Sequence, residues 1–128
     1  MKATKKMGIW MDHSMAYLMT LENDKITTNT FKSESTLPAK EQNMGVHERQ
    51  MHEKEQIRLS AFYKKISEVI IAFDDVVLFG PTDAKTELSN LLKESRHFDK
   101  IRISIQPTDK MTENQQHAFV RDFFSKSN

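Results

Sequence analysis

Two short runs of apolar residues constrain the fold of this chain more than any other feature. They are residues 7–11, Met-Gly-Ile-Trp-Met, and residues 76–79, Val-Val-Leu-Phe, which follow Asp75 and are stopped by Gly80-Pro81. Strands at the centre of a parallel sheet are covered on both faces, so they read as continuous apolar runs. We therefore expect the two runs to be adjacent, parallel central strands that are buried on both faces.

Three further segments have the composition of strands. Residues 16–21 are mostly apolar and end in a turn-like Glu-Asn-Asp-Lys, residues 26–31 are rich in β-branched side chains, and residues 101–106 alternate apolar with polar. Methionines at every fourth position from 7 to 19 would also suit a helix, but an even spacing keeps side chains on one face of a strand too. Gly8 and the polar residues 12–14 favour strands, with the methionines as core residues.

Three segments have helical periodicity. The first, residues 47–72, is polar in its opening turns and then carries apolar side chains every three or four positions. The second begins after Gly80-Pro81, where Gly80 or Thr82 can cap it, and ends near Ser95. The third begins with a capping box and presents an apolar stripe; the residues concerned are Thr112 and Gln115 for the box, and Phe119, Val120, Phe123 and Phe124 for the stripe.

The order of these segments predicts the topology. Short connections make hairpins of the first three strands, and the alternating composition of the fifth strand places it at an edge. The predicted sheet order is 3-2-1-4-5, and right-handed crossovers place the first two helices on one face and the last on the other. We therefore expect an α/β fold with a ribonuclease H-like five-stranded mixed sheet and three helices. Residues 1–128 form a single domain in this prediction, with a polar loop at residues 33–46.

Composition excludes several classes of protein. The 128 residues include no cysteine and carry a formal net charge of +1. Disulfides and thiolate metal sites are thus ruled out, and the net charge provides no overall attraction to nucleic acid or to a membrane. No apolar stretch is long enough to span a bilayer, and no signal-peptide pattern follows the basic start. We expect a cytoplasmic protein.

Three short motifs carry a family resemblance. Gly8–His13, Leu78–Lys85 and Thr108–Thr112 resemble segments of small bacterial proteins related to peptide-chain release factors, a group that includes host attachment and translational machinery proteins. The chain is similar in this respect to the middle domain of archaeal and eukaryotic release factors and of Pelota. The resemblance implies a ribonuclease H-like fold and a connection to translation. The release-factor Gly-Gly-Gln tripeptide is absent, so the resemblance does not imply peptidyl-tRNA hydrolysis.

Candidate binding residues cluster at one edge of the predicted sheet. Ligand sites of open sheets favour the carboxyl ends of parallel strands, next to the switch in strand order. The residues that we expect there are Asp12, His13, Thr82, Asp83, Lys85 and Asp109.

Two chemistries compete with a plain structural role at this edge. The carboxylates Asp12, Glu53, Asp83 and Asp109 could hold Mg²⁺, as in a metal-dependent nuclease. The turn before the second helix could bind phosphate at the helix N-terminus, with Lys85 adding charge. Local roles explain the same residues, since Asp12 suits a turn and Asp83 a first helical turn.

We accordingly assign no catalytic residue, no metal site and no cofactor. The leading hypothesis is a non-catalytic, translation-associated module that binds the ribosome, RNA or a protein partner and does not bind a membrane. The alternative is a metal-dependent nuclease or phosphodiesterase, and a third possibility is a self-associating module with no small-molecule site. The sequence leaves the oligomeric state open, and it predicts that His97 and His117 are ordinary surface residues.

Overall fold

The computed structural model of the chain describes residues 4–23, 25–33 and 48–126, with the backbone alone for residues 48–55 and 126. The predicted polar loop at residues 33–46 thus lies outside the described residues, except for Ser33. The elements in chain order are β1 (Lys6–Met11), β2 (Met15–Glu22), β3 (Lys25–Lys32), α1 (Glu48–Ile70), β4 (Asp75–Gly80), α2 (Ala84–Lys93), a 3-10 helix (Arg96–Phe98), β5 (Arg102–Pro107) and α3 (Glu113–Lys126).

The five strands form one mixed sheet of order β3-β2-β1-β4-β5, which confirms the predicted topology. β1 and β4 are adjacent and parallel, with Ile9 opposite Leu78, and β2 pairs antiparallel with both β1 and β3. β4 is buried at every position and β1 at every position after Lys6. The methionine-rich segment is therefore a hairpin and not a helix, because its apolar side chains serve both faces of the sheet.

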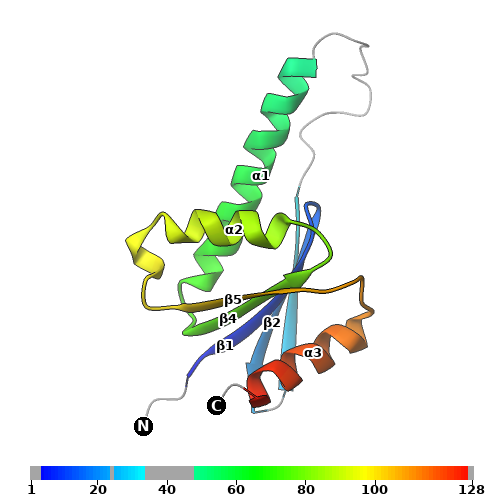
Figure 1. The fold of residues 1–128 in the computed structure, drawn as a ribbon, viewed down its shortest axis with the longest axis vertical. Helices are drawn as coiled ribbons and strands as arrows, with labels where there is room; N and C mark the ends of the chain where they lie inside the picture. The colour runs from blue at the N-terminus through cyan, green and yellow to red at the C-terminus, as the bar shows by residue number, and fades with distance from the viewer. Residues whose placement is uncertain (1–3, 24, 34–47, 127–128) are drawn as a thin grey trace.

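The helices cover the sheet on both faces (Figure 1). α1 and α2 lie on one face and enclose a core that includes Ile9, Ile66 and Leu78. α3 lies on the other face over a smaller core that includes Phe79 and Phe124. The N-terminal part of α1, whose opening turns are polar, extends beyond the sheet in Figure 1.

α3 approaches the sheet closely at Gly8. A Cβ atom added there would collide with the side chain of Val120, so a glycine lets the helix sit directly on β1. Of the predicted aromatic stripe, Phe124 is buried while Phe119 and Phe123 are partly buried. The stripe faces the sheet as predicted, and the ring of Phe119 stacks on Phe79 with 4.3 Å between centroids.

The element ends agree with the sequence-based expectations at α3 and differ from them before β5. The capping box of α3 is confirmed, since Thr112 N donates to Gln115 Oε1 at 2.9 Å and Gln115 N donates to Thr112 Oγ1 at 3.2 Å. The fifth strand begins at Arg102, one residue later than predicted, because a 3-10 helix precedes it. Ser95 begins that unpredicted helix by accepting a hydrogen bond from His97 N.

Among the helices that the structure describes, none combines the length and the apolar character needed to cross a bilayer.

Candidate functional site

The turns that follow β1, β4 and β5 lie together at one end of the sheet, where the sequence placed its candidate residues (Figure 1). Thr108 N donates to the carbonyl oxygen of Gly80 at 3.1 Å, which joins the second turn to the third. Gly80 has a φ of +145°, and a Cβ atom there would collide with the carbonyl oxygen of Met11 at the end of β1. Glycine at this position therefore lets the first two turns meet.

Asp12 closes the turn between β1 and β2. Its Oδ1 accepts hydrogen bonds from the backbone N–H groups of Ser14 at 2.7 Å and Met15 at 2.8 Å. This is an Asx-turn arrangement, in which the side chain substitutes for a backbone acceptor. The local role predicted for Asp12 is confirmed, and it fixes the orientation of the carboxylate.

His13 joins this turn to the two helices on the same face. Its Nε2 lies 3.1 Å from Oε1 of Glu87 in α2, and the same oxygen accepts a hydrogen bond of 2.6 Å from the hydroxyl of Tyr63 in α1. Burial, together with the Glu87 carboxylate, raises the pKa of Tyr63, so this phenol remains a donor. Sequence reasoning missed Tyr63 and Glu87 because no spacing links them to His13.

The turn before α2 uses its polar groups internally. Thr82 Oγ1 accepts from Ala84 N at 3.2 Å, and Lys85, which is only 6% exposed, donates through Nζ to the carbonyl oxygen of Thr82. Asp83 stands at the N-cap without a side-chain cap, while its carbonyl oxygen accepts from Thr86 N and Glu87 N. The ammonium group of Lys85 thus stabilises the turn.

The turn after β5 presents charge to solvent. Asp109 and Lys110 are both exposed, whereas Thr108 is half-buried and its hydroxyl has no hydrogen-bond partner among the described residues. Both charges are therefore accessible to a partner, as is that of Asp83 after β4.

The carboxylates of the alternative hypothesis do not converge in the described part of the chain. No group of three or more histidine, aspartate or glutamate side chains there is placed to hold a metal ion. The side chain of Glu53, one of the four proposed ligands, lies outside the described residues.

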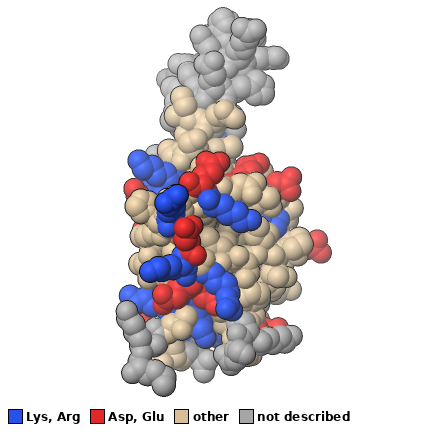
Figure 2. All heavy atoms as spheres, turned by 60° about the vertical axis from the view of Figure 1, so that its left-hand side comes forward, with Lys and Arg blue, Asp and Glu red and all other residues tan. Residues whose placement is uncertain are grey.

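Charges of both signs are mixed on the face that Figure 2 shows. Lysine and arginine side chains alternate there with aspartate and glutamate, and neither sign forms a continuous patch. This face offers no broad basic surface of the kind that binds a nucleic-acid backbone.

The prediction for His117 is wrong. Instead of an ordinary surface residue, it is a contact between α3 and the edge of the sheet, with 22% of its side chain exposed. Its Nε2 lies 3.0 Å from Oγ1 of Thr28 in β3. The sequence did not reveal this contact, because 89 positions separate the two residues.

Comparison with known proteins gives a result at the level of fold. No protein-family model matches the chain, and no curated protein matches its sequence. Among solved structures it is similar to Pelota of Archaeoglobus fulgidus, with a TM-score of 0.60 and 10% identity over 94% of this chain. It is also similar to Pelota of Thermoplasma acidophilum, with a TM-score of 0.61 and 12% identity over 98% of this chain.

An archaeal translation termination factor, aRF1, has the same fold over 95% of this chain, with a TM-score of 0.51 and 14% identity. The chain spans only 32% and 33% of the two Pelota chains and 39% of aRF1. At such low identity the similarity establishes a common architecture. The fold of this chain is therefore the one that a part of Pelota and of archaeal aRF1 also adopts.

Proposed function

We propose that this chain is a non-catalytic, translation-associated binding module of the release-factor-like type, from the bacterial group that its motifs resemble. The observation that carries the proposal is the fold, which matches parts of Pelota and of a translation termination factor over 94–98% of this chain. The Gly-Gly-Gln tripeptide does not occur in the sequence, so the proposed role is binding without peptidyl-tRNA hydrolysis.

The proposed contact surface, here called the strand-end surface, lies on the three turns at the carboxyl ends of β1, β4 and β5. Its exposed and half-buried members are Asp12, His13, Thr82, Asp83 and Asp109, while Lys85, buried in the first turn of α2, supports the Thr82 turn from within. The hydrogen bonds of Asp12 and Lys85 support a binding role, because both side chains fix backbone turns. A rigid set of turns with exposed charge at Asp109 suits recognition of a preformed partner.

We propose the ribosome as the partner, with contact to its RNA or protein, and the cytoplasm as the compartment. Polar and charged contacts of this kind tune the rate and specificity of association more than they add affinity.

The test is co-sedimentation of the tagged full chain with ribosomes from a cell lysate, with and without ribonuclease. The informative variant exchanges the charges of the exposed pair after β5, Asp109→Lys with Lys110→Asp, which leaves the net charge unchanged. We expect about tenfold less of this variant in the ribosomal fraction, because each exchanged charge would face a partner group of the same sign.

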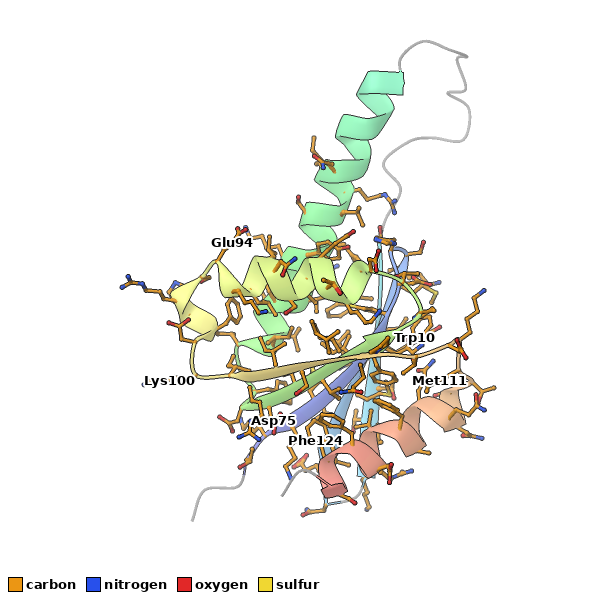
Figure 3. The ribbon with its side chains drawn as sticks, in the orientation of Figure 1. Trp10, Asp75, Glu94, Lys100, Met111 and Phe124 are labelled. Atoms are coloured by element: carbon orange, nitrogen blue, oxygen red, sulfur yellow. The ribbon has the colours of Figure 1, made fainter. Side chains whose placement is uncertain are left out.

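The chain offers a matched control at the opposite end of the same strand. Asp99 and Lys100 form a second exposed Asp-Lys pair just before β5, and exchanging them in the same way should leave co-sedimentation unchanged (Lys100 is labelled in Figure 3). Equal loss from both exchanges would contradict the strand-end surface. Absence of the unaltered chain from ribosomal fractions would contradict the translation role itself.

A further inference from the structure

A groove of about 170 Å³ opens between α1 and the end of β3, at the end of the sheet beyond which α1 continues (Figure 1). Lys32 lines this β3 groove from the strand, and the residues that line it from α1 include Ile57, Ala61, Phe62 and Lys65. Its volume is below the range of pockets that enclose small molecules, roughly 300–1,000 Å³, and suits a single large side chain. None of these residues belongs to the strand-end surface.

The α1 side of the groove is apolar and open to solvent. Ile57 is 67% exposed, which makes it the most exposed large hydrophobic side chain in the described part of the chain. Ala61, one helical turn later on the same face, is exposed as well, whereas Phe62 is buried in the core. An apolar side chain placed against Ile57 and Ala61 would remove this surface from water, which favours binding.

The charged residues that line the groove are all basic: Lys32, Arg58 and Lys65. Two of them are held in place, because Lys65 Nζ lies 5.6 Å from the ring centroid of Phe31 and Arg58 donates a hydrogen bond to the hydroxyl of Ser33. In the described part of the chain, neither lysine forms an ion pair. A partner that brings carboxylates therefore complements the groove in charge.

β3 also offers backbone groups to a further strand. Among the described strands it pairs with β2 alone. Ser33 N donates to the carbonyl oxygen of Ser14 at 2.8 Å, so the backbone of Ser33 faces β2. Residues of an antiparallel strand alternate between facing one neighbour and facing away from it, so the N–H and C=O groups of Thr30 and Lys32 face outward. An extended peptide can pair with these groups beside the groove.

We propose that the β3 groove docks an extended acidic segment of a partner protein, which adds a strand to the β3 edge of the sheet. An apolar side chain of that segment occupies the groove against Ile57 and Ala61. Side chains two positions before and after it lie on the same face of the added strand, and carboxylates there meet Lys32 and Lys65. This interaction is separate from the proposed contact of the strand-end surface.

Two other occupants fit the same surface less well. If two copies of β3 paired symmetrically over their whole length, Lys25 of each copy would lie opposite Lys32 of the other, and like charges directly opposite each other destabilise a sheet. A nucleic-acid backbone would complement the basic residues, but it would leave Ile57 and Ala61 without an apolar partner.

The probe is a labelled peptide, Thr-Glu-Thr-Leu-Thr-Glu-Thr, whose leucine and two glutamates share one face of a strand. Fluorescence anisotropy measures its binding to the full chain, and NMR of the ¹⁵N-labelled chain measures amide exchange. We expect saturable binding that weakens as salt is added, with slower exchange of the Thr30 and Lys32 amides in the complex. Peptides with lysine in place of both glutamates, or serine in place of leucine, should bind about tenfold more weakly.

Two matched pairs of variants test the groove itself. Ile57→Ser should weaken binding of the acidic peptide by about tenfold, whereas Ile71→Ser, at another exposed isoleucine, should bind like the unaltered chain. Lys32→Glu should also weaken binding by about tenfold. Lys100→Glu changes the net charge by the same amount at an exposed position before β5, and it should leave binding unchanged.

Several results would overturn the proposal. They are absence of binding by the acidic peptide, equal binding by the lysine peptide, and equal losses in the groove variants and their controls. Dimerisation in analytical ultracentrifugation that Ile57→Ser abolishes would identify a second copy as the occupant instead. Binding of single-stranded polyuridylate that Lys32→Glu abolishes and Ile57→Ser leaves intact would identify a nucleic-acid surface. No ribosome enters these measurements, so this proposal and the translation role can fail separately.

Discussion

Asp75 is the one acidic side chain that the described structure buries in the sheet, at the first position of β4. It is 9% exposed, and its Oδ1 has no hydrogen-bond partner among the described residues. Burial raises the pKa of Asp75, while Arg102 and Lys6 act against that rise. The neighbouring Asp74 differs, because its Oδ2 accepts a hydrogen bond of 2.9 Å from Lys5 N. The two adjacent carboxylates at the start of β4 thus have opposite effects on stability: burial of Asp75 is unfavourable, and the hydrogen bond of Asp74 is favourable.

We predict that Asp75→Asn stabilises the protein at neutral pH by about 1 kcal/mol, because it removes a buried charge and keeps the side-chain shape. The pKa of Asp75 is higher in the folded than in the unfolded chain. Stability of the unaltered protein therefore falls as pH rises from the ordinary carboxyl pKa through the raised one. Urea denaturation at a series of pH values should show the advantage of the variant growing over that window and vanishing at lower pH.

Asp74→Ala is the control for this measurement, and it should lose about 1 kcal/mol at neutral pH through the lost hydrogen bond to Lys5. A variant Asp75→Asn that is less stable than the unaltered protein at neutral pH would show that the favourable charge interactions with Arg102 and Lys6 outweigh the cost of burial.

At the scale of elements, α3 is held on the sheet by a cluster of apolar side chains. Val120 of α3 lies over Gly8 of β1, and Phe124, one turn later in α3, is only 2% exposed. Phe123, one position earlier, is only partly buried and meets Phe124 edge-on, with ring centroids 5.2 Å apart. The inward face of α3 is therefore centred on Val120 and Phe124.

We predict that Phe124→Ala costs about 3–5 kcal/mol of unfolding free energy, in the range of fully enclosed aromatic side chains. Phe123→Ala should cost clearly less, since part of its ring already meets solvent. Denaturant unfolding of the two variants measures both losses of unfolding free energy. Equal losses would mean that Phe123 carries as much of the α3 contact as Phe124.

At the scale of the whole molecule, burial decreases from the centre of the sheet to its edges. β1 and β4 are covered by helices on both faces, whereas exposed and half-buried positions alternate along most of β3, and β5 contains no buried position. Among the described strands, β3 and β5 each have a neighbour on one side only, so their outer backbone groups form no ladder there. Local opening should therefore start at the edges.

Native-state hydrogen exchange should show this gradient. We expect the amides of β1 and β4 to exchange only through global unfolding, and the amides of β3 to exchange faster through local opening. Residue-resolved exchange by NMR is the measurement. Protection of β3 equal to that of β4 would indicate that a further chain covers the β3 edge in solution.

The sequence by itself determined the architecture. Continuous apolar runs required the parallel centre, β-branched and alternating segments required the edges, and short polar connections required hairpins, so the sheet order followed. The turn role of Asp12 and the capping box at Thr112 were predictable for the same reason. The Asp12 turn and the capping box both depend on interactions between residues close together in the chain, so a short sequence spacing predicts them.

Only the tertiary structure decided which side chains meet across the fold. The contacts of His13 with Glu87 and of His117 with Thr28 join distant segments, and the unpaired indole of Trp10 depends on the absence of an acceptor among spatial neighbours. The preference for Phe124 over Phe123 depends on the rotation of α3 about its axis. Contacts of this kind form because tertiary packing brings distant segments together, so no spacing in the sequence predicts them.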